Sequence, residues 1–131
     1  MKKILIDTNA YTSFLAGDKH ILNVLGESDV VYMSVIVLGE LYAGFRGGKK
    51  ERENKSTLAE FLSKPSIKIL NVTSNTAEVF GVVKDNLKSA GTPIPISDVW
   101  IAAHAIETGS MVITYDNDFK KVMGLLLWDW E

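Results

Sequence analysis

Short runs of apolar residues alternate along the chain with longer segments in which apolar residues recur every three or four positions. This alternation is typical of βαβ units, in which parallel strands form a central sheet and helices cover its faces. The short runs predict strands at residues 3–6, 30–33, 67–72, 111–114 and 125–128. We therefore expect an α/β fold, a three-layer α/β/α sandwich with a mainly parallel central sheet of about five strands.

Two apolar stripes predict amphipathic helices, one after the capping residue Ser34 and one before Gly91 and Pro93, which favour the end of a helix. Their members are Leu38, Leu41, Tyr42 and Phe45 in the first and Val79, Phe80, Val83, Leu87 and Ala90 in the second. Ser97 can cap a third helix, residues 98–108, which is apolar nearly all round. We expect this third helix to lie deep in the core.

Length and composition indicate one domain, residues 1–131, long enough to bury about two-thirds of its unfolded surface. The absence of cysteine removes disulfides, thiolate metal sites and cysteine nucleophiles. The apolar runs are too short for a membrane span or for the core of a signal peptide. We expect a cytoplasmic protein that has no contact with a membrane.

The formal charge of −2 gives no general attraction to nucleic acid, so any such contact must be local. The one basic segment is 46–55, in which Arg46, Lys49, Lys50 and Arg52 could contact RNA phosphates. Most charged runs of this kind are the solvated face of a helix, and that interpretation stays open here.

Acidic residues occur where the predicted strands and helices meet. Asp7 directly follows the first strand, and Asp116 comes just after the strand at 111–114. The carboxyl ends of parallel strands share one edge of the sheet, where ligands bind. Asp98 falls in the first turn of the buried helix, where a structural role beside the helix dipole is the ordinary alternative. Glu40 lies away from the apolar stripe of its helix, among small residues that leave room for a cleft.

Together, Asp7, Glu40, Asp98 and Asp116 would gather several negative charges in one pocket. Such a cluster is unfavourable unless protons or cations neutralise it. Oxygen ligands select hard cations, which makes Mg²⁺ or Mn²⁺ the natural counter-ion. One ion, or a pair about 4 Å apart, would activate water and neutralise phosphate charge, which indicates phosphodiester hydrolysis.

At these positions the sequence resembles PIN-domain nucleases and, among them, the VapC-type toxin ribonucleases of toxin–antitoxin pairs. The resemblance follows the family's order over almost the whole chain, although each motif is weak alone. The matching segments are Ile6-Asp7-Thr8-Asn9, residues 34–44 with Gly39-Glu40-Leu41, residues 91–98 with Ser97-Asp98, Ile101-Ala102-Ala103, Thr114-Tyr115-Asp116-Asn117-Asp118-Phe119 and residues 124–128.

The resemblance implies a metal-dependent endoribonuclease, the toxin of a toxin–antitoxin pair, that a cognate antitoxin holds inactive. It also implies a homodimer. The four acids would be the catalytic and metal-binding residues, and Asp118 would be an accessory acid. Thr8, Asn9 and Thr114 would support or orient the acids, and Thr8 and Asn9 could also cap the helix that follows Asp7.

Two other functions remain open from the residues alone. A phosphatase of the haloacid dehalogenase type also places an aspartate after the first strand, but it requires a second aspartate where Asn9 stands. A catalytically silent PIN-like module that binds RNA or protein would carry the same acids without using them. Saturable metal binding would distinguish the nuclease from the silent module.

Several residues that could act in catalysis or binding have more ordinary interpretations. His104 is expected to be a hydrogen-bonded core residue, and His20 lies in a polar connection without a partner motif. Trp128 and Trp130 could stack on RNA bases, but packing of the last strand is the expected role of Trp128.

Overall fold

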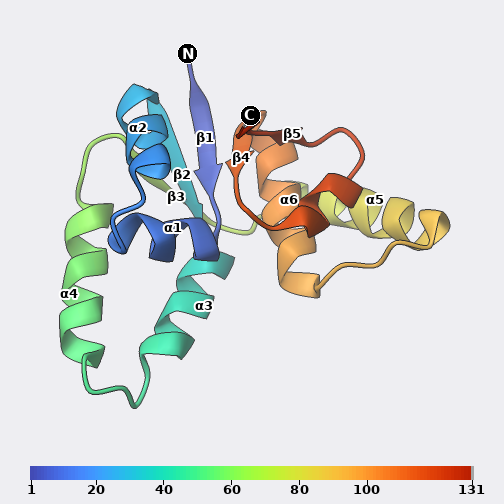
Figure 1. Ribbon diagram of the computed structural model, residues 1–131. Helices are drawn as coiled ribbons and strands as arrows, with labels where there is room; N and C mark the ends of the chain where they lie inside the picture. Colours follow the sequence, from blue (N-terminus) through green and yellow to red (C-terminus); the bar gives the residue numbers. More distant parts are fainter. Residues whose placement is uncertain (131) are drawn as a thin grey trace.

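The computed structural model describes residues 1–130, which form a five-stranded sheet with helices on both faces (Figure 1). All strand pairings are parallel, and the order across the sheet is β3-β2-β1-β4-β5. The strands are β1 Lys3–Ile6, β2 Val30–Ser34, β3 Ile67–Leu70, β4 Met111–Ile113 and β5 Leu126–Leu127. The expected sheet is confirmed, although β3, β4 and β5 are shorter than predicted.

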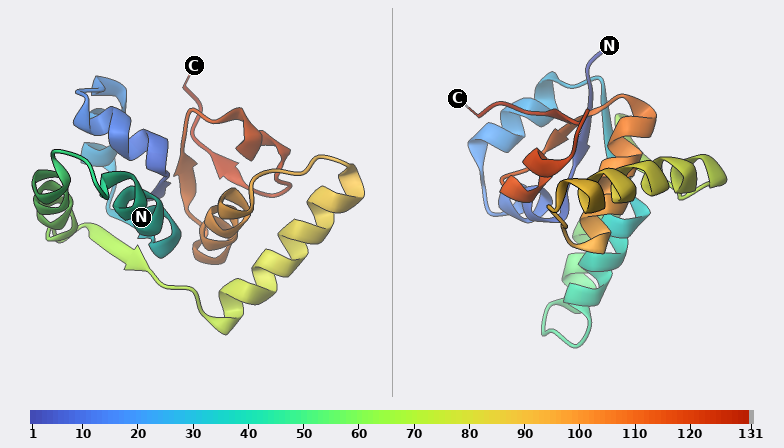
Figure 2. Two further views of the ribbon diagram at one scale, coloured as in Figure 1. Left: turned by 90° about the horizontal axis from the view of Figure 1, so that it is seen from below. Right: turned by 90° about the vertical axis from the view of Figure 1, so that its right-hand side faces the viewer.

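Within residues 1–130, six α-helices and one 3₁₀ helix connect the strands. They are α1 Thr8–Leu15, α2 Lys19–Glu27, α3 Val35–Phe45, α4 Glu51–Leu62, α5 Ser74–Ala90, α6 Ile96–Thr108 and the 3₁₀ helix η1 Asn117–Lys121. Helices α1, α2 and α4 lie on one side of the sheet, and α5 and α6 lie on the other (Figures 1 and 2). This division follows from right-handed crossovers, because the chain passes from β1 to β3 in one direction and then returns to β4.

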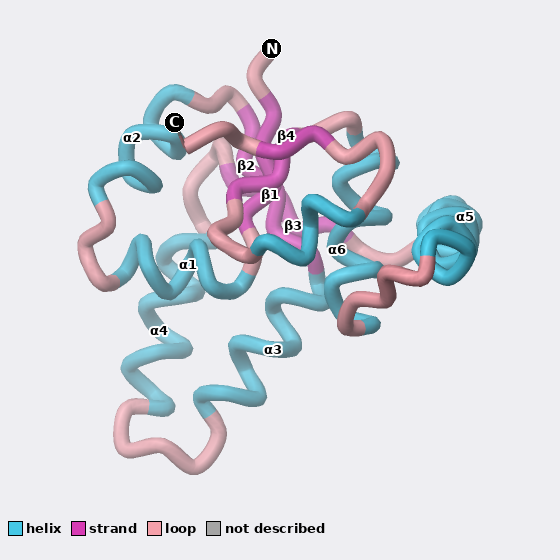
Figure 3. The backbone as a smooth tube through the Cα atoms, turned by 45° about the vertical axis from the view of Figure 1, so that its right-hand side comes forward, coloured by secondary structure: helices cyan, strands magenta, loops and turns pink. Residues whose placement is uncertain are grey.

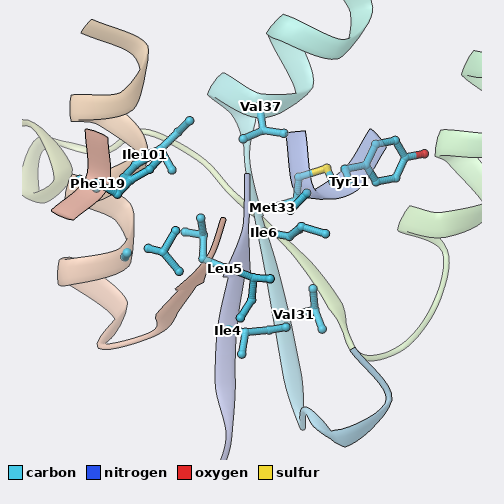
Figure 4. Close-up of a cluster of buried hydrophobic side chains, with 14 of the residues drawn as sticks. Ile4, Leu5, Ile6, Tyr11, Val31, Met33, Val37, Ile101 and Phe119 are labelled. Carbon is cyan, nitrogen blue, oxygen red and sulfur yellow. The ribbon is translucent and has the colours of Figure 1, made fainter. Parts of the chain in front are cut away.

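The core fills both sides of the sheet. Ile4, Leu5 and Ile6 of β1 have no exposed surface, as expected of a central strand in a parallel sheet with helices on both faces. Tyr11 packs on one side of the sheet, and Phe119 lies on the other (Figure 4). The consecutive apolar residues before Asp7 are therefore explained by burial on both faces of β1.

The helix starts differ from the prediction at two of three places. Ser34 does cap α3, since its side chain accepts a hydrogen bond from the backbone N–H of Ile36. Asp7 itself caps α1, so the expected capping by Thr8 or Asn9 is wrong. Helix α6 begins at Ile96, which places Ser97 in its first turn, so the expected Ser97 cap is wrong as well.

Each helix stripe has two buried members and one exposed member. Leu38, Leu41, Val83 and Leu87 are buried, whereas Tyr42 is 41% exposed and Ala90 is exposed. Gly91 ends α5 with a left-handed backbone, as predicted. Helix α6 is deeply buried, as expected from its composition. None of the helices within residues 1–130 is both long and apolar enough to cross a membrane.

Candidate metal centre

Five acidic residues converge where the strands end. Helices α1, α3 and α6 all begin near the carboxyl ends of the central strands (Figure 3). Asp7 follows β1, Glu40 lies on α3, Asp98 is in the first turn of α6, and Asp116 and Asp118 follow β4. The structure thus brings together all four acids selected from the sequence and the accessory acid with them.

Three of these carboxylates are especially close. Asp98, Asp116 and Asp118 each offer one oxygen, and these oxygens lie within 4.8 Å of one another. Such a group could hold a metal ion. Asp118, expected to be an accessory acid, belongs to this closest group, whereas Asp7 and Glu40 lie outside it.

Asp7 is held by two hydrogen bonds and is only 4% exposed. The backbone N–H of Ala10 donates to its Oδ1 at 2.8 Å, and the hydroxyl of Thr114 donates to its Oδ2 at 2.5 Å. Burial raises the pKa of Asp7, and the charges of Asp116 and Glu40 add to this effect. The two hydrogen bonds lower the pKa, but burial outweighs them.

Thr114 connects Asp7 to the other acids. Its Oγ1 accepts a hydrogen bond from the backbone N–H of Asp116 at 2.9 Å. Asp116 in turn accepts one from the backbone N–H of Asp118, also at 2.9 Å. A continuous chain of hydrogen bonds therefore runs from Asp118 to Asp7 and fixes the end of β4 against the end of β1.

Glu40 is the exposed member of the centre. The hydroxyl of Thr8 donates to its Oε1 at 2.8 Å, which links the start of α1 to the middle of α3. Thr8 and Thr114 thus each donate a hydrogen bond to one of the acids, and the supporting role that the resemblance implied for them stays a prediction. Asn9 is exposed in the first turn of α1, and its backbone carbonyl accepts a hydrogen bond from the hydroxyl of Thr12.

The pKa of Asp98 reflects its burial and the concentration of negative charge in the centre. Burial raises its pKa to about 6, and repulsion from Asp116, Glu40, Asp7 and Asp118 contributes. On the outer side, Lys121 pairs with Asp118 at 3.2 Å, an exposed contact. One exposed lysine does not neutralise five acids, and the donor set of carboxylates suits a hard divalent cation.

The basic segment lies apart from the acids. Arg46, Lys49 and Lys50 occupy the turn between α3 and α4, and Arg52 lies in the first turn of α4. This turn is at the end of α3 away from the sheet (Figure 1). All four side chains are exposed. The structure does not bring them to the acid centre, so an RNA contact at this segment stays a prediction.

His104 is a core residue, as predicted. It is fully buried, its Nδ1 lies 2.9 Å from the hydroxyl oxygen of Ser34, and its Nε2 lies 3.1 Å from the backbone oxygen of Asn71. Because the carbonyl can only accept, Nε2 carries the hydrogen and Ser34 donates to Nδ1. His20 is exposed on α2, with its ring edge-on to Trp130.

Sequence reasoning missed the role of Tyr115. This residue follows Thr114 directly, and its ring stacks on Trp130 with centroids 4.6 Å apart. The hydroxyl of Tyr115 donates to Asp18 at 2.6 Å, and the indole of Trp130 donates to the backbone oxygen of Thr114 at 2.8 Å. Aromatic residues in the last segment of the chain were a signal, but the partner of Trp130 was not visible in the sequence.

Comparison with known proteins identifies similar sequences. The PIN domain family profile matches residues 4–125. The chain is 31% identical to "Ribonuclease VapC2" of Rickettsia felis over 111 residues, which cover 84% of this chain and 81% of that protein. It is 29% identical to "Ribonuclease VapC4" of Mycobacterium tuberculosis, with 66% and 67% covered.

Solved structures share the fold. A toxin–antitoxin complex, VapBC2 from Rickettsia felis bound to a promoter DNA fragment, contains a chain that matches with a TM-score of 0.84 and 28% identity. The match covers 98% of this chain and 99% of that one. DNA-bound VapBC from Salmonella typhimurium matches with a TM-score of 0.89 and 26% identity over both entire chains. The similarity therefore extends over the sheet, the helices and the edge that carries the acids.

Proposed function

Because the chain belongs to the PIN domain family, we propose that it is a metal-dependent endoribonuclease, the toxin of a toxin–antitoxin pair. In this proposal the chain hydrolyses phosphodiester bonds of RNA. Its relatives are named ribonucleases, which supports this activity. The observation that carries the proposal is the convergence of five carboxylates at one edge of the sheet, with three of them within 4.8 Å of one another.

The acids divide into metal ligands and acids that are held in place beside them. Asp98, Asp116 and Asp118 form the group whose oxygens are close enough to share an ion, and Asp7 and Glu40 complete the catalytic set. The cofactor is Mg²⁺ or Mn²⁺, because the donors are oxygens. When bound, such an ion lowers the pKa of an attacking water and neutralises charge on the phosphate.

Two threonines hold the acids in place. The hydroxyl of Thr114 holds Asp7 by a hydrogen bond, and the hydroxyl of Thr8 holds Glu40 in the same way. Both are positioning residues, since they act through a carboxylate. Fixed carboxylates do not need to reorganise when substrate binds, which is the general advantage of a preorganised site.

A cognate antitoxin is the expected protein partner. Solved structures with the same fold include VapBC complexes from Rickettsia felis, Salmonella typhimurium and Haemophilus influenzae. An antitoxin that neutralises this chain has to relieve or cover the concentrated negative charge, and a cationic side chain would do both. A homodimer also stays a prediction, as does the organisation of residues 1–131 as a single domain.

The two alternative functions, a phosphatase and a catalytically silent module, are not equally supported. The family match disfavours the haloacid dehalogenase phosphatase. A catalytically silent module would retain the fold and the acids without binding metal, so titration with Mn²⁺ separates it from the nuclease. In the described centre, all four acids expected from the sequence are present, and none is replaced by a basic residue.

Cleavage of total cellular RNA by the purified chain, freed of antitoxin, tests the proposal. We expect discrete cuts with Mg²⁺ or Mn²⁺ that disappear with EDTA and in the Asp98→Asn variant. Asp85→Asn on α5 is the matched control, because it removes an exposed acid outside the centre and should cleave normally. Absence of metal-dependent cleavage together with absence of saturable Mn²⁺ binding would support the silent module instead.

A further inference from the structure

An aromatic cluster lies beside the acid centre. The rings of Tyr115 and Trp130 are stacked, with centroids 4.6 Å apart and an angle of 30° between their planes. Trp128 meets Trp130 edge-on, with centroids 6.3 Å apart. Tyr115 remains 44% exposed, so the stacked pair is not simply a part of the core.

The cluster borders a cavity that shares Thr114 and Asp116 with the acid centre. The cavity has a volume of about 110 Å³, and its lining includes all three aromatic residues together with Thr114, Asp116 and Lys120. Thr114 and Asp116 also belong to the hydrogen-bond chain that ends on Asp7. A group in this cavity would therefore lie next to the acids.

The chemistry of the lining favours a nucleobase over a phosphate. Asp116 would repel an anion inside the cavity, whereas a base carries no charge and offers a flat ring for stacking. Lys120 also lines the cavity, and because it is exposed it can contact the phosphate of the same nucleotide. The side chain of Asn117, which also lines the cavity, has a donor and an acceptor for the edge of a base.

The aromatic rings are fixed before any ligand arrives. Asp18, at the start of α2, accepts the hydroxyl of Tyr115 at 2.6 Å, and the backbone of Thr114 accepts the indole N–H of Trp130 at 2.8 Å. A surface that is already ordered loses little conformational entropy on binding. The cluster therefore has the rigidity of a binding surface.

We propose that this cavity binds one unpaired nucleobase of the RNA, next to the phosphate that is cleaved. The inference rests on the proposed ribonuclease function and adds a base-binding site to it. A base in this cavity cannot be paired at the same time, so the cleaved nucleotide must lie in a single strand, loop or bulge.

Indole N–H signals in the NMR spectrum of ¹⁵N-labelled protein test the proposal. The chain has three tryptophans, and Trp100, which stacks on Phe80 between α5 and α6, serves as an internal control. The probe is a short oligoadenylate, added at low salt in EDTA so that nothing is cleaved. We expect the Trp130 signal to shift in a saturable way while that of Trp100 stays in place. An abasic oligomer of equal length should leave both signals unchanged.

A matched pair of variants separates the ring from its hydroxyl. Tyr115→Ala should weaken binding of oligoadenylate about tenfold. Tyr115→Phe loses the bond to Asp18 but keeps the ring that stacks on Trp130, so it should weaken binding much less than Tyr115→Ala. The unchanged Trp100 signal would show that both variants are folded.

Three results would overturn the proposal: a Trp130 signal that does not move with oligoadenylate, an equal shift with the abasic oligomer, or unchanged affinity in Tyr115→Ala. If Tyr115→Ala instead weakened only the complex with the antitoxin, the cluster would be a protein-docking surface. Because binding is measured without metal, a failure of RNA cleavage would count against the proposed function and leave this result intact.

Discussion

Thr114 donates a 2.5 Å hydrogen bond to Asp7, a residue 107 positions earlier in the chain. The same hydroxyl oxygen accepts the backbone N–H of Asp116. One side chain therefore sets the relative positions of the acids that follow β1 and β4. The acid centre depends on the pairing of these two strands as much as on the acids themselves.

Replacing Thr114 by Val should reduce RNA cleavage by about tenfold or more, because Asp7 loses its hydroxyl donor and is then held only by the backbone N–H of Ala10. The unfolding free energy should also fall by about 1–3 kcal/mol, the usual effect of leaving a buried polar group without its partner. Thr114→Ser retains the hydroxyl and is the matched control. Cleavage rates and urea denaturation of both variants test this, and equal activity of Val and Ser would exclude a positioning role.

The pKa of Asp98 predicts how stability changes with pH in metal-free protein. Its pKa in the folded state is about 6, above the ordinary value of 3.8. Its contribution to stability is therefore fully present below pH 3.8 and is lost as the pH rises through about 6. Above that pH the wild type should be less stable than Asp98→Asn, by about 1–2 kcal/mol after allowance for solvent screening.

Urea denaturation of wild type and Asp98→Asn in EDTA, at a series of pH values, measures this difference. We expect the gap between the two proteins to open between about pH 4 and pH 7. Asp85→Asn should not reproduce it, because that acid lies outside the cluster. A constant gap at all pH values would show that Asp98 does not titrate in this range.

Metal binding should depend on Asp118 as well as on the acids selected first. Its carboxylate lies with Asp98 and Asp116 in the closest group, so Asp118→Asn should weaken Mn²⁺ binding about tenfold. Calorimetric titration with Mn²⁺ measures the affinity, with Asp85→Asn as the control. An unchanged affinity would return Asp118 to the accessory role that the sequence suggested.

Neutralising the basic segment tests its predicted contact with RNA phosphates. If Lys49, Lys50 and Arg52 each contact a phosphate, their replacement by Gln should lower the slope of log affinity against log salt by about 2. Replacement of Lys19, Lys64 and Lys68, all exposed elsewhere, gives a control with the same change in charge. If both triple variants gave the same slope of log affinity against log salt, the basic segment would be solvated and would not contact RNA phosphates.

Ser34 should matter for stability out of proportion to its size. Its hydroxyl oxygen caps α3, and the hydroxyl hydrogen goes to Nδ1 of the buried His104. Ser34→Ala should lower the unfolding free energy by about 2–4 kcal/mol, since it removes a cap and leaves a buried ring nitrogen without a partner. Denaturation in urea measures the loss, and Ser63→Ala, an exposed serine after α4, should have little effect.

The sheet was predictable because strands buried on both faces have consecutive apolar residues, as in Ile4, Leu5 and Ile6. The convergence of Asp7 and Asp116 followed from the rule that parallel strands end at one edge. Ser34 was recognisable as a cap because a serine preceded an apolar stripe. These inferences all depend on local patterns or on one topological rule.

The remaining features depend on the geometry of turns or on contacts between segments that are separate in the sequence. Asp7 rather than Thr8 caps α1, because the bend after β1 brings its carboxylate over the N–H of Ala10. Asp118 joined the closest group of acids only through the turn into η1. The stacking of Trp130 on Tyr115 required the last segment to return to the end of β4. A local sequence pattern cannot show that the last segment packs against the end of β4.

The order of the strands also determines when the acid centre can form during synthesis of the chain. During synthesis, β1 emerges first, but its neighbour β4 begins only at Met111. Until that strand is added, Asp7 has no Thr114, and the chain carries neither Asp116 nor Asp118. A nascent chain therefore carries an incomplete centre until residues 114–118 have been synthesised.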